Sequence, residues 1–334
     1  MKIRPFLLTL LVLVLAIALS IAVGSVFIPP RDLWLVLTGH PPVDVSQAAA
    51  IVLTLRLPRT ALLLLTGAAL GTSGAAYQGL FRNPLADPYL VGVASGAGLG
   101  AVLAMSLQWP YTTAGLLAVP AAAFVGALGT VFLVYFLARV GKTLPTTNLI
   151  LAGVAFSFFA SALTSYMMLR STGELRRAIA WLLGGSAQVG WGPVLSILPF
   201  LLPGLVILLL SGHSLNLLQF GDDQAAQMGL PVMRVRTILL IAASLATASA
   251  VAFSGIIGFI GLIVPHIIRL AFGADHRRLL PLSLLGGAAL LILSDVLARV
   301  IMAPQELPVG IVTALAGVPF FLWILRRAKN QGYW

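Results

Sequence analysis

Apolar stretches of about 20 residues, the length of a helix that spans a bilayer, recur along the whole sequence. Reading these runs between charged residues and Pro or Gly breaks predicts ten transmembrane helices. They lie near residues 6–28, 60–80, 91–108, 114–138, 147–169, 193–212, 235–254, 256–271, 279–300 and 308–327. The third and the eighth are short and rich in glycine, so we expect partial or tilted spans there. The sequence therefore predicts an all-α polytopic membrane protein, with residues 1–334 forming a single transmembrane domain.

Charged side chains are too few to cover the surface of a water-soluble protein of this length. They make up 9% of the 334 residues, against about 25% in an ordinary soluble domain. A soluble enzyme is therefore excluded. The net charge of +11 does not indicate a nucleic-acid partner, because the basic residues lie between apolar stretches, where they orient helices and contact lipid headgroups. The chain has no cysteine, which excludes disulfides and thiolate chemistry.

The basic residues also predict an orientation. Ten spans place both termini on one side, and if that side is the cytoplasm, 13 of the 20 Lys and Arg residues lie inside and 7 lie outside. Because cytoplasmic loops carry the excess of Lys and Arg, both termini are predicted to be cytoplasmic. The first span follows Lys2 and Arg4, and it is longer than the apolar core of a signal peptide, so we expect it to be retained. The seven outside arginines exceed what this rule leads us to expect.

Two short motifs resemble enzyme sites. Residues 141–143 (GKT) resemble the end of a phosphate-binding loop, but Phe136 stands where that loop requires a glycine, so we do not expect this chain to bind ATP. Residues 71–74 (GTSG) match the serine motif of intramembrane proteases, with His266 as the base of a Ser–His dyad. Such short matches are frequent among the glycines and serines of membrane helices. The simpler interpretation is that Ser73 hydrogen-bonds to a neighbouring helix.

An ionisable side chain well inside a span would indicate a proton or ion pathway. Asp295 is the best candidate, and Arg299 follows it four residues later. An ion pair at this spacing near a helix end accounts for both residues without proton coupling. An ion-gradient-driven secondary transporter therefore stays as the alternative function. The four histidines are scattered without a ligand spacing, so we predict no metal site and no bound cofactor.

Small residues recur at four-residue spacing in two of the predicted spans. Gly67 and Gly71 lie in one of them, and Gly92, Gly96 and Gly100 lie in the next. This spacing places small residues on one face of a helix, where they allow two backbones to approach closely. We therefore expect close helix packing at both places.

The most informative hydrophilic segment is residues 215–236. Residues 221–223 (GDD) supply acidic N-capping groups, which a helix dipole also favours. Gly229 suits the position just after a helix, and Pro231 prevents continuation. The pattern predicts a short helix, capped at both ends, on the cytoplasmic face. It acts either as a rigid plug for a soluble partner or as a surface helix packed on its own bundle.

The same segment, residues 221–231 (GDDQAAQMGLP), is similar to the coupling segment of the FecCD-type permeases. These are the membrane subunits of bacterial ABC importers for cobalamin, haem and ferric siderophores. Further matching stretches follow in family order: residues 55–59 (LRLPR), 83–88 (NPLADP), 151–154 (LAGV), 258–266 (GFIGLIVPH), 275–277 (DHR) and 306–313 (ELPVGIVT). Each motif alone is a weak signal, whereas the ordered set from about residue 50 to 327 is specific.

The resemblance implies a type II ABC importer permease fold, a two-fold homodimer of permeases and a bacterial inner-membrane location. It implies that a periplasmic or surface substrate-binding protein delivers a bulky metal chelate. Two ATP-binding cassette subunits would then power its import. ATP and Mg would be bound by those partners, so this chain is expected to be a transport subunit and not an enzyme. The sequence does not distinguish ferric siderophores, haem and cobalamin as the cargo.

The resemblance also assigns roles to residues of this chain. The matches to arginines that dock the binding protein are Arg56, Arg59 and Arg299. This role would account for part of the excess of arginines predicted outside the cytoplasm. Arginine suits it because a guanidinium can pair with a carboxylate through two hydrogen bonds. The matches to a cytoplasmic gate are Asn83, Leu85, Thr146 and Thr147. The matches to the ATPase coupling segment, within residues 215–231, are Gly221, Asp222, Asp223, Ala225, Ala226, Met228, Gly229 and Leu230.

Overall fold

The computed structural model describes residues 3–24, 28–39, 46–107, 113–141, 143–170, 174–185 and 190–329. These residues are mostly helical, and no strand is formed among them. Among the described residues, seven helices of at least 18 residues are apolar enough to cross a bilayer. Three shorter apolar stretches of 10–17 residues accompany them, Val93–Ser106, Ile260–Phe272 and Val309–Ile324. The ten apolar helices coincide with the ten predicted spans, and the predicted all-α polytopic fold is confirmed. The two spans predicted to be short are the helices of 14 and 13 residues.

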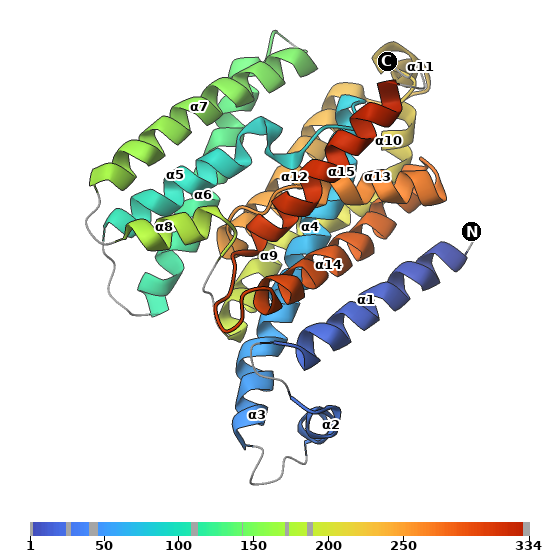
Figure 1. Cartoon of the computed structure of the whole chain (residues 1–334). Helices are drawn as coiled ribbons and strands as arrows, with labels where there is room; N and C mark the ends of the chain where they lie inside the picture. The colour runs from blue at the N-terminus through green and yellow to red at the C-terminus, as the bar shows by residue number, and fades with distance from the viewer. Residues whose placement is uncertain are drawn as a thin grey trace.

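Short elements connect some of the apolar helices, whereas other apolar helices follow one another directly (Figure 1). The ten apolar helices are α1 (Arg4–Ala22), α4 (Leu57–Phe81), α5 (Val93–Ser106), α6 (Thr113–Ala138), α7 (Thr146–Arg170), α9 (Trp191–Leu210), α12 (Val232–Ser254), α13 (Ile260–Phe272), α14 (His276–Val300) and α15 (Val309–Lys329). The connecting elements are α2 (Pro30–Leu37), α3 (Ser46–Ala50), the π-helical η2 (Ile51–Arg56), the 3-10 turn η3 (Pro88–Val91), α8 (Leu175–Leu182), α10 (Gly212–Leu218) and α11 (Asp222–Gln227).

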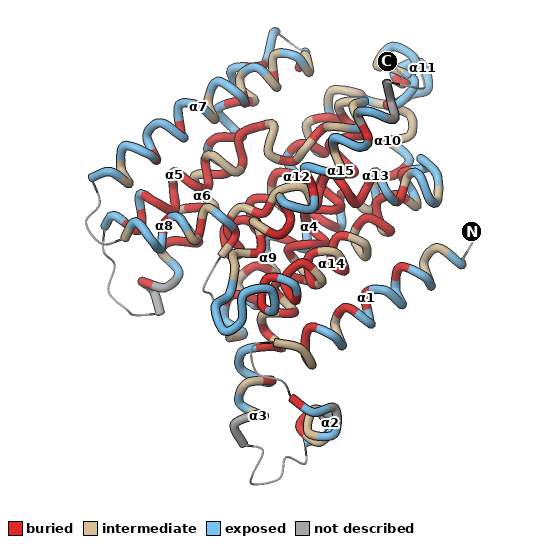
Figure 2. The backbone as a smooth tube through the Cα atoms, viewed as in Figure 1, coloured by how far each residue is buried: buried red, intermediate tan, exposed pale blue. Residues whose placement is uncertain are grey.

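Helices α4, α12 and α14 form the centre of the bundle, and their residues are the most deeply buried (Figure 2). Helix α9 packs on α12 and α4, and α1 lies at the outside against α14. Helices α5, α6 and α7 form a second group, which joins the centre through contacts with α12. The main apolar cluster of the described core therefore extends through both groups. A second, smaller cluster is formed by Ile21, Ile28, Val36 and Val52.

Glycines set the spacing between the central helices. A Cβ atom on Gly67 would collide with the backbone carbonyl of Gly287 in α14, and Gly71 lies against the same helix. In the second group, a Cβ on Gly100 in α5 would collide with the carbonyl of Ala122 in α6. The close helix packing predicted from the small-residue spacing is confirmed, because only a missing side chain permits these approaches.

The first two spans differ from their predicted bounds. Helix α1 ends at Ala22 instead of near residue 28. The second span was predicted to begin near residue 60, because Arg56 and Arg59 interrupt the apolar run. In the structure α3, η2 and α4 form one helical segment, and its apolar part covers residues 48–81. The helix continues through the arginines because both have partners inside the bundle, described below.

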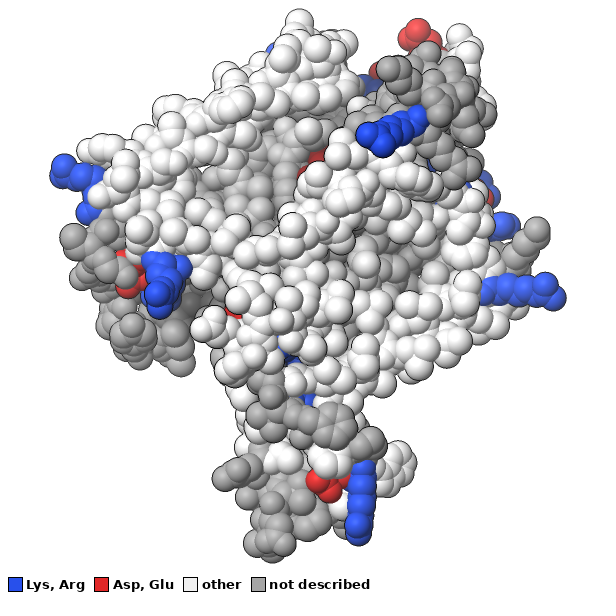
Figure 3. Space-filling model, in the orientation of Figure 1, with Lys and Arg blue, Asp and Glu red and all other residues white. Residues whose placement is uncertain are grey.

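Both ends of the described chain lie at one end of the bundle. Helix α1 begins and α15 ends toward the end that carries α11 (Figure 1). The surface between the two ends is largely uncharged, with Lys and Arg gathered at its margins (Figure 3). Large apolar side chains such as Leu7, Phe132 and Phe158 are exposed on α1, α6 and α7. Such a surface matches the lipid-facing belt of a membrane bundle.

Candidate functional site

Helix α11 is a six-residue helix bounded by two glycines. Gly221 before it has φ +101° and Gly229 after it has φ +85°, conformations that favour glycine. The N–H of Leu230 donates to the carbonyl of Ala225 at 3.0 Å, and the N–H of Gly229 donates to that of Ala226 at 2.9 Å. This is the Schellman pattern, which satisfies the last carbonyls of a helix. The C-terminal stop predicted at Gly229 is confirmed.

The N-terminal end of α11 differs from the prediction. Gly221 is the N-cap residue and no side chain caps the helix, so the expected acidic cap is wrong. Asp222 and Asp223 lie in the first turn instead, where the helix dipole still favours negative charge. Asp222 Oδ1 accepts a hydrogen bond from Arg236 Nη2 at 2.8 Å and lies 4.0 Å from Arg82 Nη2. The Asp222 carboxylate faces the bundle because two arginines attract it.

One face of α11 points away from the bundle. Ala225 is fully buried against the neighbouring helices, and α11 packs on α10 and α12. The exposed residues of this segment are Asp223, Gln224, Ala226, Gln227, Met228 and Gly229. The segment is thus both packed on its own bundle and open on the opposite face. A short helix held in this way presents a defined exposed surface.

The turn after α4 carries two of the predicted gate residues. Arg82 adopts a left-handed φ of +50° and ends the helix. The N–H of Asn83 donates to the carbonyl of Gln78 at 3.1 Å, and Asn83 Oδ1 accepts from the N–H of Leu85 at 2.9 Å. This local bonding of an Asn side chain to the backbone two residues on fixes the shape of a turn. Asn83 and Leu85 are half-buried in it.

Asp87 holds the other end of the same connection. Its Oδ1 accepts from the N–H of Tyr89 at 2.8 Å and caps η3. Desolvation of this half-buried carboxyl raises the pKa of Asp87 to about 6. The hydroxyl of Tyr89 donates to the carbonyl of Ile257 at 2.9 Å. The connection between α4 and α5 is therefore fixed by polar contacts at both ends.

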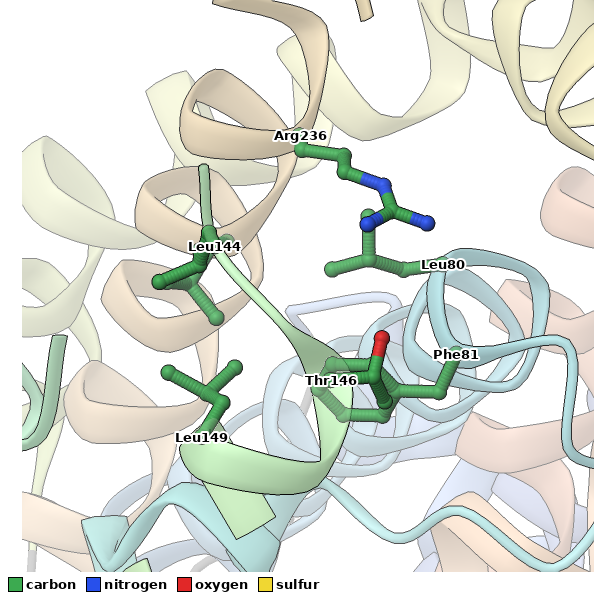
Figure 4. Close-up of a pocket in the computed structure, with 7 residues that line it drawn as sticks. Leu80, Phe81, Leu144, Thr146, Leu149 and Arg236 are labelled. Atoms are coloured by element: carbon green, nitrogen blue, oxygen red, sulfur yellow. The ribbon is translucent and has the colours of Figure 1, made fainter. Parts of the chain in front are cut away.

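A small pocket lies between the end of α4, the start of α7 and the first turns of α12 (Figure 4). Its lining residues are Leu80, Phe81, Leu144, Thr146, Leu149, Arg236 and Leu240. Thr146 is the first residue of α7, and the Arg236 side chain extends toward Leu80 from the α12 helix (Figure 4). The pocket brings Thr146 next to the end of the helix that leads to Asn83. Thr147 is exposed, and neither it nor Leu85 lines this pocket.

Two of the three predicted docking arginines are buried at the end of α1. Arg56 Nη1 donates to the carbonyls of Ile21 and Ala22 at 2.7 and 2.9 Å. Arg299 Nη1 donates to the carbonyl of Val23 at 3.0 Å. The last carbonyls of a helix have no partner within the helix, and cationic side chains satisfy them well. Arg56 and Arg299 are 6% and 4% exposed, and they fix α1 to α4 and α14.

Arg59, the third docking arginine, binds two acidic side chains. Its Nη2 lies 2.7 Å from Asp295 Oδ1, and its Nη1 lies 2.6 Å from Glu306 Oε2. Asp295 Oδ2 lies 3.0 Å from Arg299 Nε, so the predicted pair of Asp295 and Arg299 is confirmed. The structure thus brings Arg59 and Arg299 together on one carboxylate. The Arg59 side chain is 36% exposed, which leaves part of its guanidinium surface open.

Ser73 takes part in helix packing. Its hydroxyl donates to the carbonyl of Ala243 in α12 at 3.2 Å, and the residue is fully buried. The interhelical bond predicted for Ser73 is confirmed. His266 lies edge-on to Phe320 of α15, with ring centroids 6.2 Å apart. A nucleophilic serine needs a base on its hydroxyl, whereas this hydroxyl is committed to a backbone carbonyl. The geometry does not support a Ser73/His266 protease.

Sequence reasoning missed three residues of these clusters. Arg82 and Arg236 were interpreted as topology determinants only, and Glu306 as part of a family motif. Their partners lie far along the chain or around a turn, and no local spacing signals such pairs. The one available signal was that Arg234 and Arg236 follow the acidic start of α11 within 14 residues, in a chain with few charges.

The apolar helical bundle of the described residues, with a short helix at one end, is that of a polytopic membrane protein. Residues 11–327 match the FecCD transport family, and the chain belongs to that family. It is 43% identical to the uncharacterized ABC transporter permease protein YvrB of Bacillus subtilis, over 96% of this chain and 92% of that protein. The family match and this relative show that the chain is an ABC transporter permease.

Two further relatives have names that state a cargo. The cobalamin import system permease protein BtuC of Halobacterium salinarum is 46% identical over 84% of this chain and 74% of that protein. The hemin transport system permease protein HmuU of Yersinia pestis is 40% identical over 96% of this chain and 95% of that protein.

Solved structures agree with the fold. A metal-chelate type ABC transporter in an inward-facing conformation superposes with a TM-score of 0.82, at 31% identity, over 97% of this chain and 98% of that chain. PsaBC from Streptococcus pneumoniae, in complex with Fab, matches with a TM-score of 0.57 at 17% identity, over 86% of this chain and 98% of that chain. The second match bears on the fold alone.

Proposed function

We propose that this chain is the membrane-spanning permease subunit of a binding-protein-dependent ABC importer that moves a bulky metal chelate into the cytoplasm. The observation that carries the proposal is α11, a glycine-bounded helix with one face buried on the bundle and the other face exposed. In this proposal two copies of the chain form a homodimer in the bacterial inner membrane, with all termini in the cytoplasm. Two ATP-binding cassette subunits bind the exposed face of α11.

The cargo is proposed from the relatives. One is named for cobalamin import and another for hemin transport, and a structural neighbour is described as a metal-chelate type transporter. These cargoes share a metal held in a wide organic ligand, and ferric siderophores belong to the same chemical class. We therefore propose cobalamin, haem and ferric siderophores as the candidate cargoes. Specificity among them is expected to lie largely in the binding protein.

In the proposed cycle, ATP and Mg bind the partner subunits, which also hydrolyse the ATP. The permease performs no covalent step. Its contribution is a difference in free energy between an inward-open and an outward-open state, which nucleotide on the partner reverses. The gate that responds is formed by Asn83 and Leu85 after α4 and by Thr146 and Thr147 at the start of α7.

Binding-protein docking is proposed at the opposite end of the bundle. Arg59 is suited to contact an acidic partner directly, because part of its guanidinium is open while Asp295 and Glu306 hold its position. Arg56 and Arg299 already donate hydrogen bonds to carbonyls at the end of α1, and Arg299 also pairs with Asp295. Direct docking through these two requires α1 to move. If α1 does not move, these two arginines only help to hold the structure around Arg59.

The alternative function is an ion-gradient-driven secondary transporter. It would need an intramembrane carboxylate that takes up and releases an ion or a proton. Asp295 is that candidate, and its ion pairs with Arg59 and Arg299 account for its burial as a structural contact. The structure and the relatives therefore favour the ABC importer.

Uptake into proteoliposomes tests the proposal. The vesicles hold the chain, the ATP-binding cassette subunit that copurifies with it, and its binding protein. Cobalamin, haemin and a ferric hydroxamate siderophore are offered in turn, with and without ATP on the side of the ATPase. We expect ATP-dependent accumulation of at least one of them. Accumulation driven by an ion gradient without ATP would instead establish the secondary transporter.

A further inference from the structure

Arg236 lies where three elements of the proposed machinery meet. It belongs to the second turn of α12, and its side chain lines the pocket between the end of α4 and the start of α7 (Figure 4). Thr146, a proposed gate residue, lines the same pocket, as does Phe81 at the end of α4. A change in the position of the Arg236 side chain therefore changes the lining between these two helices.

The same side chain is tied to α11. Arg236 Nη2 donates to Asp222 Oδ1 at 2.8 Å, and Asp222 is the first residue of α11. The Asp222 side chain is 43% exposed, whereas that of Arg236 is 11% exposed. The ion pair thus joins a carboxylate at the surface, on the helix proposed to contact the ATPase, to a guanidinium inside the bundle.

The burial of Arg236 makes this link stiff. Its Nε is buried and has no hydrogen-bond partner among the described residues. Few other hydrogen-bond acceptors are available to a guanidinium in this position. Leaving a buried charge without its partner strongly destabilises the protein. When α11 moves, the Arg236 side chain must either follow Asp222 or become unpaired. Displacement of α11 therefore changes the position or the pairing of a side chain that lines the pocket.

We propose that Arg236 is a positioning residue that transmits movement of α11, through Asp222, to the packing of α4 against the start of α7. The inference rests on the proposed function, in which the ATPase moves α11 and Thr146 belongs to the cytoplasmic gate. It deepens that function by naming the contact that joins the two. Arg82, whose Nη2 is 4.0 Å from the same carboxylate, assists from the α4 side.

The chain offers a matched control. Arg234 lies two residues before Arg236 on the same helix and is exposed. Arg236→Gln and Asp222→Asn remove the link from either end. Arg234→Gln removes the same charge beside it. Because Asp222 is partly exposed, Asp222→Asn tests the link even if Arg236→Gln folds poorly.

The experiment measures the gate directly. The chain has no cysteine, so Thr146→Cys introduces a single thiol of similar size at the pocket. The complex with its ATP-binding cassette subunit is placed in lipid nanodiscs. The rate at which a bulky, membrane-impermeant maleimide modifies this thiol is then compared without nucleotide and with ATP plus vanadate. Copurification of the ATPase reports that the complex is intact.

We expect nucleotide to change the modification rate in the Thr146→Cys background and in the Arg234→Gln control. Arg236→Gln and Asp222→Asn are expected to lose most of that change while the ATPase stays bound. Arg236→Lys, which keeps the charge but loses the fork of the guanidinium, is expected to retain part of it. These results would separate transmission from a merely structural role.

Two outcomes overturn the inference. If Arg236→Gln and Asp222→Asn respond to nucleotide as the Arg234→Gln control does, α11 and the gate are coupled by another route and Arg236 does not transmit. If the Thr146→Cys background shows no nucleotide response although ATPase is bound, the proposed gate itself is wrong, and the inference falls with it. The two failures are distinguishable because only the second appears in the background variant.

Discussion

Asp295 is held between two arginines, one on its own helix and one on α4. Its side chain is 2% exposed, and that of Arg299 is 4% exposed. A buried charge is tolerated only when it is paired, and removing one partner is far costlier than removing an exposed pair. Arg299 in turn binds the carbonyl of Val23, so one carboxylate fixes α4, α14 and the end of α1.

We expect Asp295→Asn to lower the free energy of unfolding by about 3–5 kcal/mol, because it leaves a buried guanidinium without its counter-charge. Glu306→Gln is the control, since its side chain is 41% exposed, and an exposed pair contributes about 0–1 kcal/mol. Thermal unfolding in detergent measures both. A larger effect of Glu306→Gln than of Asp295→Asn would contradict the structural role assigned to Asp295.

Asp87→Asn tests a second carboxyl, which is half-buried, through the pH dependence of stability. Folding raises the pKa of Asp87 to about 6, so its stabilising contribution is complete below an unfolded-state pKa of about 4 and is lost as the pH rises through about 6. Asparagine keeps the acceptor that caps η3. We therefore expect the Asn variant to melt above the parent chain at about pH 8 and close to it at about pH 4.

Asp275→Asn is the control of opposite sign. The hydrogen bond from Asn216, 2.6 Å long, lowers the pKa of Asp275. Its carboxylate therefore stabilises the fold above the unfolded-state pKa, and that contribution is lost as the pH falls. Thermal melts of all three proteins across this pH range measure the difference. A pH-independent gap between Asp87→Asn and the parent chain would show that the Asp87 carboxyl does not titrate as described.

At the scale of elements, α4 is the helix on which the others are assembled. It packs on α14, α12, α13 and α9, and η2 extends it to the arginines of the docking cluster. Its glycines allow the approach to α14, and the turn that follows it carries Asn83. One helix therefore connects the arginine cluster at one end of the bundle to the proposed gate at the other.

Gly67→Ala tests this packing. Its Cβ would collide with the backbone carbonyl of Gly287, which cannot rotate away as a side chain would. We expect a loss of about 1–3 kcal/mol from overpacking. Gly129→Ala in α6 is the control, because nothing lies within 4 Å of its added Cβ, and alanine there gains up to about 1 kcal/mol of helix propensity. Equal melting temperatures for the two variants would argue against close contact between α4 and α14.

At the scale of the whole molecule, the two ends of the bundle have different chemistry. One end carries α11, Asp222 and its two arginines, and the other carries Arg59 with Asp295 and Glu306. In the proposed function the first end meets the ATPase and the second meets the binding protein. The two surfaces can therefore be tested separately.

Arg59→Gln is expected to weaken binding-protein affinity at low ionic strength by about tenfold, roughly 1.4 kcal/mol. Arg176→Gln, at an exposed arginine of α8, is the control and should change affinity little. Binding is measured by surface-immobilised titration at two salt concentrations. The same affinity for the Arg59 and Arg176 variants would remove Arg59 from the docking surface.

Arg56→Gln is expected to lower the melting temperature of the chain, because it leaves the carbonyls of Ile21 and Ala22 unpaired.

The sequence and the structure agree on features that depend on local chain properties. Run length is enough to count ten spans, and Gly229 with Pro231 is enough to end α11. The start of the second span was misplaced, because a local reading treats Arg56 as a break and cannot supply its partner on α1. Likewise, 236 residues separate Arg59 from Asp295. Side-chain pairs between distant helices follow from packing and have no signature in local sequence.

The contact between Arg299 and the end of α1 also has a consequence for biosynthesis. Arg299 Nη1 donates to the carbonyl of Ser20, a residue 279 positions earlier in the chain. Ribosomes add about 5–20 residues per second, so roughly 15–55 s pass between the synthesis of Ser20 and that of Arg299. During that interval α1 lacks the Arg299 contacts that later fix its C-terminal end. A nascent chain arrested before Arg299 should therefore leave α1 open to crosslinking by the insertion machinery, and release of the arrest should close it.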